Sequence, residues 1–199
     1  MKIFNMKRRI FATTVVIMGK KFVFKRNVDK LMQKNYERVI QRLRAKFGKQ
    51  KIKVGFLISE QAKWQYQSLY EDMAKSSYFE PVVLVTNLVC SHKKKKNHFY
   101  KTIEECYDFF KQKNLNVRYV YDIKKSRYLN AKELDVDILF YQQPWEIDDK
   151  QHPINVSEYA LTCYVTYGMH LVNYANSYMY NFHHFLWKMF VESSDVVTY

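Results

Sequence analysis

The chain has 199 residues, a length that suits one domain plus an extension. Apolar residues make up 48%, with 17 Tyr and 14 Phe, so the composition excludes a disordered chain. Only four Gly and three Pro argue against a collagen-like chain, a linker array or a turn-rich β-sandwich. The net charge of +14 is uneven, because residues 1–53 hold 17 Lys and Arg against two acidic residues, while the remainder is close to neutral.

This charge asymmetry predicts an anionic partner, such as a membrane surface, nucleic acid or an anionic polymer. No nucleic-acid-binding motif accompanies the basic residues, which argues against nucleic acid. The longest apolar run, 10–18, is about half of the ~20 residues that a membrane span needs, and no signal-peptide cleavage site follows it. Cys90, Cys106 and Cys163 form no CxxC pair, so we expect reduced, mostly buried thiols in a cytosolic protein, with no metal site and no cofactor.

Residues 27–48 have apolar positions at helical spacing and predict an amphipathic helix, with Asn27 able to cap its start and Gly48 its end. Two interpretations stay open for its basic face: contact with anionic lipid, or simple exposure to solvent on a helix packed against its own domain. We assign residues 1–50, which include this helix, to a basic N-terminal arm. The candidate membrane-binding residues are Lys30, Lys34, Arg38, Arg42 and Lys46.

From residue 51 onward, strand patterns alternate with helix patterns. Strands are expected at 51–58, 82–88, 116–121, 137–141 and 161–166, helices at 60–76, 98–114 and 177–192, a short helix or loop at 128–134, and a sixth strand beginning at 196–199. This alternation predicts an α/β fold: a doubly wound, mainly parallel Rossmann-like sheet over 51–199, with strand order 3-2-1-4-5. Because a strand would close the chain, we expect a larger protein of which this is the N-terminal half, so that 51–199 is an incomplete domain.

Ligands of open parallel sheets bind beyond the carboxyl ends of the strands. That rule selects the polar residues that follow five expected strands: 59–61, the lysine-rich loop 91–97, 121–122, 142–145 and 167–170. Glu60 and His170 are the candidate catalytic bases, although Glu60 also suits a helix N-terminus and His170 also suits a hydrogen-bonded loop. Trp145 could stack on a sugar or base, or be a packed loop aromatic, and Lys93–Lys96 could hold phosphates or be solvated.

Several common site motifs are absent from the sequence. It contains neither GxGxxG nor GxxxxGK[ST], which argues against a dinucleotide oxidoreductase and a P-loop NTPase. Ser59 lacks the flanking glycines of a nucleophile elbow. His183 and His184 are adjacent, so on a helix they would diverge by ~100° and could not share a metal ion.

Five segments resemble one family. The stretches 54–64, 79–86, 137–145 and 160–168, together with Ser68-Leu-Tyr70, are similar to the start of bacterial CDP-glycerol glycerophosphotransferase-like proteins of teichoic acid and capsule polymer synthesis. The likeness covers roughly residues 27–192. Its most distinctive parts are Phe140-Tyr-Gln-Gln-Pro-Trp145 and Tyr167-Gly168.

The resemblance implies a GT-B-type transferase with two Rossmann-like halves, which moves glycerol phosphate from CDP-glycerol to a cell-wall or capsular glycopolymer. The N-terminal half would serve the lipid-linked or polymeric acceptor, at the cytoplasmic face of the membrane, as a peripheral protein. CDP-glycerol would be bound by a C-terminal half whose motifs are not in these residues, so this half alone should be inactive. The resemblance and the strand-end rule together select the candidate substrate-binding residues: Ser59, Gln61, Trp64, Gln142, Gln143, Trp145, Tyr167 and Gly168.

Two other functions remain open. The chain could be half of a GT-B glycosyltransferase that uses a nucleotide sugar, or a non-catalytic Rossmann-like binding module that its basic arm tethers to an anionic membrane. A donor screen separates the two transferases, and salt-sensitive vesicle binding without any transfer would favour the module.

Overall fold

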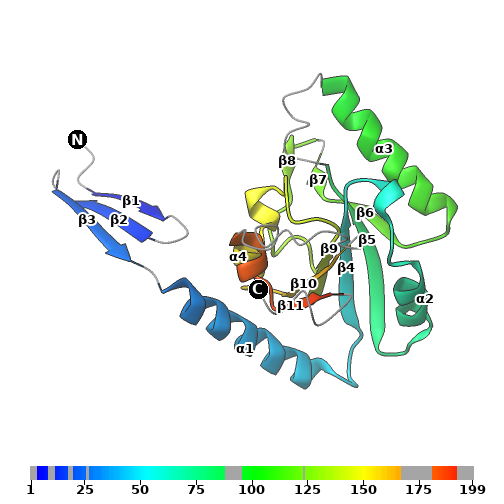
Figure 1. The fold of residues 1–199 in the computed structure, drawn as a ribbon, viewed down its shortest axis with the longest axis horizontal. Helices are drawn as coiled ribbons and strands as arrows, with labels where there is room; N and C mark the ends of the chain where they lie inside the picture. Colours follow the sequence, from blue (N-terminus) through cyan, green and yellow to red (C-terminus); the bar gives the residue numbers. More distant parts are fainter. Residues whose placement is uncertain are drawn as a thin grey trace.

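A computed structural model of the chain describes residues 4–8, 12–17, 20–25, 27–87, 96–122, 124–166 and 181–191. Two sheets dominate it (Figure 1). A small antiparallel sheet has the order β1-β2-β3, formed by Phe4–Arg8, Ala12–Ile17 and Lys20–Lys25. It lies at the N-terminal end of helix α1, Val28–Lys46, away from the main sheet.

The main sheet is parallel throughout its six strands, with the order β11-β10-β9-β4-β5-β6. Numbered along the chain, this is 3-2-1-4-5-6, so the predicted doubly wound order is confirmed and gains one strand. The strands are β4 Ile52–Ile58, β5 Phe79–Val85, β6 Val117–Tyr119, β9 Ile138–Tyr141, β10 Leu161–Val165 and β11 Lys188–Phe190.

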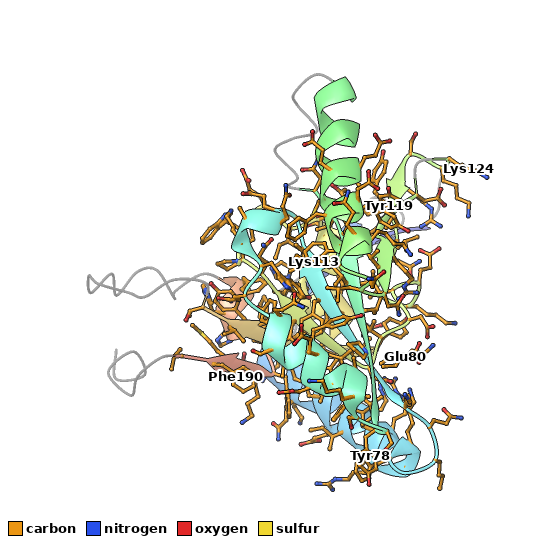
Figure 2. The ribbon with its side chains drawn as sticks, turned by 90° about the vertical axis from the view of Figure 1, so that its right-hand side faces the viewer. Tyr78, Glu80, Lys113, Tyr119, Lys124 and Phe190 are labelled. Atoms are coloured by element: carbon orange, nitrogen blue, oxygen red, sulfur yellow. The ribbon has the colours of Figure 1, made fainter. Side chains whose placement is uncertain are left out.

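Helices cover both faces of this sheet (Figure 1). One face carries the short 3-10 helix η1, Gln61–Lys63, and helices α2, Gln67–Lys75, and α3, Lys96–Gln112. Figure 2 looks onto this face. The other face carries α1, the 3-10 helix η3, Asp149–Gln151, α4, Pro153–Val156, and α5, Asn181–His184. A two-stranded ribbon, β7 Tyr121–Asp122 with β8 Arg127–Tyr128, follows β6.

The core lies on both sides of β4, β5 and β9. Phe56 on β4 contacts the rings of Trp64, Tyr66 and Tyr70 on the α2 face. On the opposite face Gly55 leaves no room for a side chain, because an added Cβ would lie 2.8 Å from Leu84 Cδ1 and about as close to two further side chains. The glycine inside this buried strand therefore allows the segment that precedes β9 to pack closely on the sheet.

Helix α1 belongs to the same core. Its buried residues are Val28, Met32, Asn35, Tyr36, Val39 and Leu43. Tyr36 Oη donates to the carbonyl of Phe185 at 2.6 Å and is hydrogen bonded to Thr162 Oγ1 on β10. Asn35 Nδ2 donates to Ser157 Oγ at 3.0 Å. The helix that we grouped with the basic arm is therefore attached to the sheet by apolar and polar contacts.

Three expected elements were wrong in extent or kind. The predicted helix 60–76 is two pieces, η1 and α2, because Trp64 and Tyr66 turn inward and Tyr66 Oη donates to the Tyr141 carbonyl at 2.7 Å. The predicted helix 177–192 is, where the structure describes it, the short α5 followed by β11. The second strand starts at Phe79 and includes Pro81, at a position where β6 has not yet begun to pair. The strand expected at 196–199 lies outside the described residues.

Candidate functional site

The side chain of Gln142 joins two strand ends at the carboxyl edge of the sheet. β4 and β9 are neighbours in parallel pairing, with Leu57 opposite Tyr141, so the residues that follow them meet at this edge. Gln142 Oε1 accepts from the Ser59 amide at 2.9 Å, from Ser59 Oγ at 3.1 Å and from the Glu60 amide at 3.3 Å. Its Nε2 donates to the Glu60 carbonyl at 2.7 Å. Gln142 is 1% exposed, so it positions the loop after β4 from within the protein.

A second polar contact joins the same two loops nearer the surface. Lys63 Nζ lies 3.0 Å from Glu60 Oε1 and 3.2 Å from Gln143 Oε1. Gln143 Nε2 in turn donates to the carbonyl of Trp145 at 3.0 Å. The carboxylate of Glu60 is 37% exposed and paired with a cation, so this edge presents a cation and an anion side by side.

A shallow pocket opens beside Gln142 at the ends of β4, β5 and β9. It encloses about 260 Å³, counting the space open to solvent, and its enclosed part has room for about one water molecule. The polar lining residues are Ser59, Thr86, Asn87, Gln142, Gln143 and Glu146. A pocket of this size suits one hydroxyl or a small polar group better than a whole nucleotide.

Glu146 is the carboxylate that lines this pocket, and its backbone is in the left-handed region with a φ of 55°. That conformation is uncommon for a residue other than glycine, and such strain concentrates at functional sites. Strand-end reasoning stopped at Trp145 and missed Glu146. The sequence contains no signal for its backbone conformation, because no glycine or asparagine marks the position.

The floor of the pocket is a buried polar network that sequence reasoning also missed. Gln151 is fully buried; its Oε1 lies 3.4 Å from Thr86 Oγ1, and its carbonyl accepts from Tyr141 Oη at 2.6 Å. Burial raises the pKa of the Tyr141 phenol well above its usual value, so the hydroxyl stays a donor. Tyr128 Oη donates to the Asn87 carbonyl at 3.3 Å. The network fixes the loops after β5 and β9 relative to each other.

The two candidate tryptophans lie in different surroundings. Trp64 packs against Phe56 and Phe110, with Nε1 donating to Gln67 at 2.8 Å, so its ring belongs to the core between the sheet and α3. Trp64 is half-buried, so a substrate-stacking role for its ring stays a prediction. Trp145 is 43% exposed and follows Pro144 at the carboxyl edge, where a sugar ring could reach it.

The other expected site residues are placed as follows. Ser59 and Gln61 lie at the carboxyl edge, Ser59 buried and Gln61 half-buried at the start of η1. His170, Tyr167 and Gly168 lie outside the described residues, as does most of the lysine-rich loop 91–97. Of the described cysteines, Cys106 and Cys163 are free and buried as expected, and burial raises the pKa of each thiol to about 12.

Part of the basic face of α1 is turned toward the domain. Lys46 Nζ is ion-paired with Asp137, Arg42 Nη2 lies 3.5 Å from the same carboxylate, and Arg38 reaches the carbonyl of Glu158 at 3.4 Å. Among the five candidate membrane-binding residues, Lys30 and Lys34 point to solvent without such a contact to the sheet side. Binding of lipid by this helix face stays a prediction, and it would have to compete with these contacts.

Comparison of the chain with family models, with curated proteins and with solved structures gives no match. Within the described residues, no helix combines the length and the apolar character required to cross a bilayer. What is established is an α/β fold with a six-stranded parallel Rossmann-like sheet, whose carboxyl edge carries a shallow pocket.

Proposed function

We propose that this chain is the acceptor-side half of a GT-B-type transferase that moves glycerol phosphate from CDP-glycerol to a cell-wall or capsular glycopolymer. One observation supports this most. The segments that resemble the glycerophosphotransferase-like proteins, 54–64 and 137–145, are about 80 residues apart in sequence and meet at the carboxyl edge through Gln142. The most distinctive part of the resemblance thus lies at the edge where parallel sheets bind ligands.

The residues that line the pocket include groups that the proposed transfer reaction needs. In this transfer the acceptor hydroxyl oxygen forms a bond to the phosphorus that carries glycerol, the bond from that phosphorus to the CMP oxygen breaks, and the hydroxyl proton passes to a base. Glu60 and Glu146 are two of the described carboxylates that follow strands at this edge. Glu60 is paired with Lys63, whereas Glu146 lines the pocket. Glu146 is therefore the better-placed base, and Ser59, Thr86 and Asn87 supply groups that could orient the hydroxyl.

The donor would be held by a second half. No phosphate-cradling glycine motif is present in the sequence, and the pocket is too small for a nucleotide. A division of labour between two halves explains both facts. It also places the reaction between the carboxyl edge of this sheet and the donor-bearing half, at the inner face of the membrane where a lipid-linked acceptor is presented.

The test is an assay of the protein joined to its donor-binding half, with CDP-glycerol and a lipid-linked acceptor, in which release of CMP is measured. We expect CMP release that depends on the acceptor, and a loss of about 10²- to 10⁴-fold in kcat for Glu146→Gln, which cannot accept the proton. Glu158→Gln, on the surface after α4, serves as the matched control and should retain full activity. Absence of CMP release with every acceptor tried would contradict the proposal.

Two alternatives remain distinguishable by the same protein. If a nucleotide sugar and not CDP-glycerol supports transfer, the chain is half of a glycosyltransferase. If no donor supports transfer and the protein still binds anionic vesicles, it is a membrane-tethered binding module.

A further inference from the structure

Two exposed aromatic side chains stack against each other at the amino edge of the sheet, opposite the proposed site. Phe47 follows the last residue of α1 and Tyr78 directly precedes β5, and their ring centroids are 5.0 Å apart with an interplanar angle of 14°. Phe47 is 55% exposed and Tyr78 is 48% exposed. Of the four large exposed apolar side chains in the described part of the chain, two are thus in one place.

Local structure fixes this pair. α1 ends at Lys46, and Gly48 has a φ of 76°, which turns the chain sharply toward β4. The Ile52 amide then donates to the Tyr78 carbonyl at 2.8 Å, which holds the entry to β4 beside the entry to β5. The rings therefore come from the end of α1 and the start of β5, which this contact between β4 and Tyr78 holds close together.

The charged residues of the two segments that carry the rings are all cations. Residues 44–51 and 73–79 contain no Asp or Glu, and the exposed acidic residues Asp72 and Glu80 flank the second segment. Lys46 forms an ion pair with Asp137. The remaining cations of these segments are exposed: Arg44, Lys49, Lys51 and Lys75. We call Phe47, Tyr78 and these four cations the aromatic tip.

We propose that the aromatic tip binds an anionic lipid surface, with the two rings entering the headgroup region and the cations contacting lipid phosphates. Tyrosine rings, which have one polar end, and cations on long apolar stems favour the membrane–water interface, and a phenylalanine ring beside them adds apolar area that the interface can bury. The tip also protrudes: Tyr78 lies at the lower extremity of the molecule in Figure 2. A convex end suits a flat surface, whereas single-stranded nucleic acid is bound along a groove, so lipid is favoured over nucleic acid.

This inference refines the membrane partner in the proposed function and sets the orientation of the site. β4 has seven residues, so its carboxyl end lies about 20 Å from the tip. A protein held by its tip would direct the pocket at Ser59 and Glu146 away from the bilayer. The acceptor group it meets would then be the distal end of a polymer chain, and not the lipid headgroup.

The test is flotation of the full chain with vesicles of phosphatidylcholine containing about one quarter phosphatidylglycerol. We expect the double substitution Lys49→Glu with Lys51→Glu to weaken partitioning by at least about 25-fold, since each cation near such a surface contributes about fivefold. We expect Phe47→Ala with Tyr78→Ala to weaken it by about tenfold, through loss of apolar area. Binding should also fall as salt is raised.

Control variants place changes of the same kind elsewhere on the surface. Lys124→Glu with Lys132→Glu reverses two exposed charges, and Phe190→Ala removes an equally exposed aromatic ring; Figure 2 shows Lys124 and Phe190 away from Tyr78. These variants should bind vesicles as the unaltered chain does. Circular dichroism melting of every variant confirms that it is folded.

Two results would overturn the proposal: tip variants that bind vesicles as well as the unaltered chain, or tip variants that lose binding to a short oligouridylate while vesicle binding is unchanged. The assay contains no donor or acceptor. A failure here therefore leaves the transferase proposal intact, and absence of CMP release leaves the lipid contact intact.

Discussion

At the scale of single residues, the buried side-chain amide of Gln142 holds the loop after β4 in place through several hydrogen bonds. Both ends of the amide are used: the oxygen accepts from three groups of Ser59 and Glu60, and the nitrogen donates to the Glu60 carbonyl. Because the amide is shielded from water, removing it leaves backbone groups of the loop without partners, which is more costly than losing an exposed hydrogen bond.

We therefore expect Gln142→Ala to lower the free energy of unfolding by about 3 kcal/mol, from unpaired backbone groups and the cavity left behind. Urea denaturation measures this. Gln33→Ala is the matched control, because the Gln33 amide is exposed and bonds only to Glu37 on the same helix; its cost should stay under about 0.5 kcal/mol. Equal costs for the two variants would show that Gln142 does not hold the loop.

A second prediction at this scale concerns His183. Burial lowers the pKa of the His183 imidazole from 6.5 to about 4 in the folded protein. The unfolded chain then binds a proton below pH 6.5 that the folded chain does not, so stability is lost as pH falls from 6.5 toward 4. Allowing for partial exposure, we expect His183→Leu to reduce the drop in stability between pH 7 and pH 5 by about 1 kcal/mol. Urea midpoints at the two pH values measure it, and an unchanged drop would contradict the assignment.

Sequence reasoning found part of this site because strand ends are visible in the sequence. Ser59, Gln142 and Gln143 were selected by their place after apolar strands, and all three lie at the carboxyl edge. The sequence could not reveal that Gln142 binds its own backbone, because that depends on the pairing of β4 with β9. It also could not reveal the backbone strain at Glu146 or the inward turn of Trp64, both of which are set by tertiary contacts.

At the scale of elements, helix α1 is joined to the sheet through a buried carboxylate. Asp137, at the start of β9, is 7% exposed and accepts from the Lys53 amide at 2.9 Å, in addition to its contacts with Lys46 and Arg42. Asp135, two residues earlier, pairs with Lys53 at 2.5 Å, but its side chain is 63% exposed. The two neighbouring ion pairs thus differ chiefly in burial.

That difference gives a matched pair of substitutions. Asp137→Asn should cost about 2 kcal/mol, because it leaves the partly buried Lys46 ammonium without its counter-charge. Asp135→Asn should cost less than about 0.5 kcal/mol, since exposed ion pairs contribute little and Asn tolerates the positive φ of this position. Chemical denaturation of both variants measures the difference. A cost for Asp135→Asn as large as that for Asp137→Asn would contradict the role given to burial.

Elements with strong patterns were predictable and the others were not. The ends of the five expected strands differ by three residues or fewer from those of β4, β5, β6, β9 and β10. These strands were predictable because apolar runs are typical of buried parallel strands. Residues 181–190 place apolar residues at 182, 185–187, 189 and 190, a spacing that fits neither a helix nor a strand period over its whole length. Pairing of β11 with β10 decides that segment, and pairing is a long-range property.

At the scale of the whole molecule, the two ends of the sheet have different chemistry. The carboxyl edge carries a shallow pocket lined by Glu146, and the amino edge carries the stacked rings and exposed cations of the aromatic tip. The overall α/β class and strand order followed from the alternation of patterns along the sequence. The aromatic tip did not, since Phe47 and Tyr78 are 31 positions apart and only the neighbouring starts of β4 and β5 bring them together.

The proposed function requires that the carboxyl edge binds the acceptor. The most direct measurement is a titration of the isotope-labelled chain with a short glycerol phosphate oligomer, followed by amide chemical shifts in NMR spectra. If the acceptor binds at this edge, we expect saturable shifts at 59–61, 86–87 and 142–146, and no shifts there on addition of CDP-glycerol alone. Shifts absent from these segments, or shifts confined to the basic residues before Asn27, would contradict it.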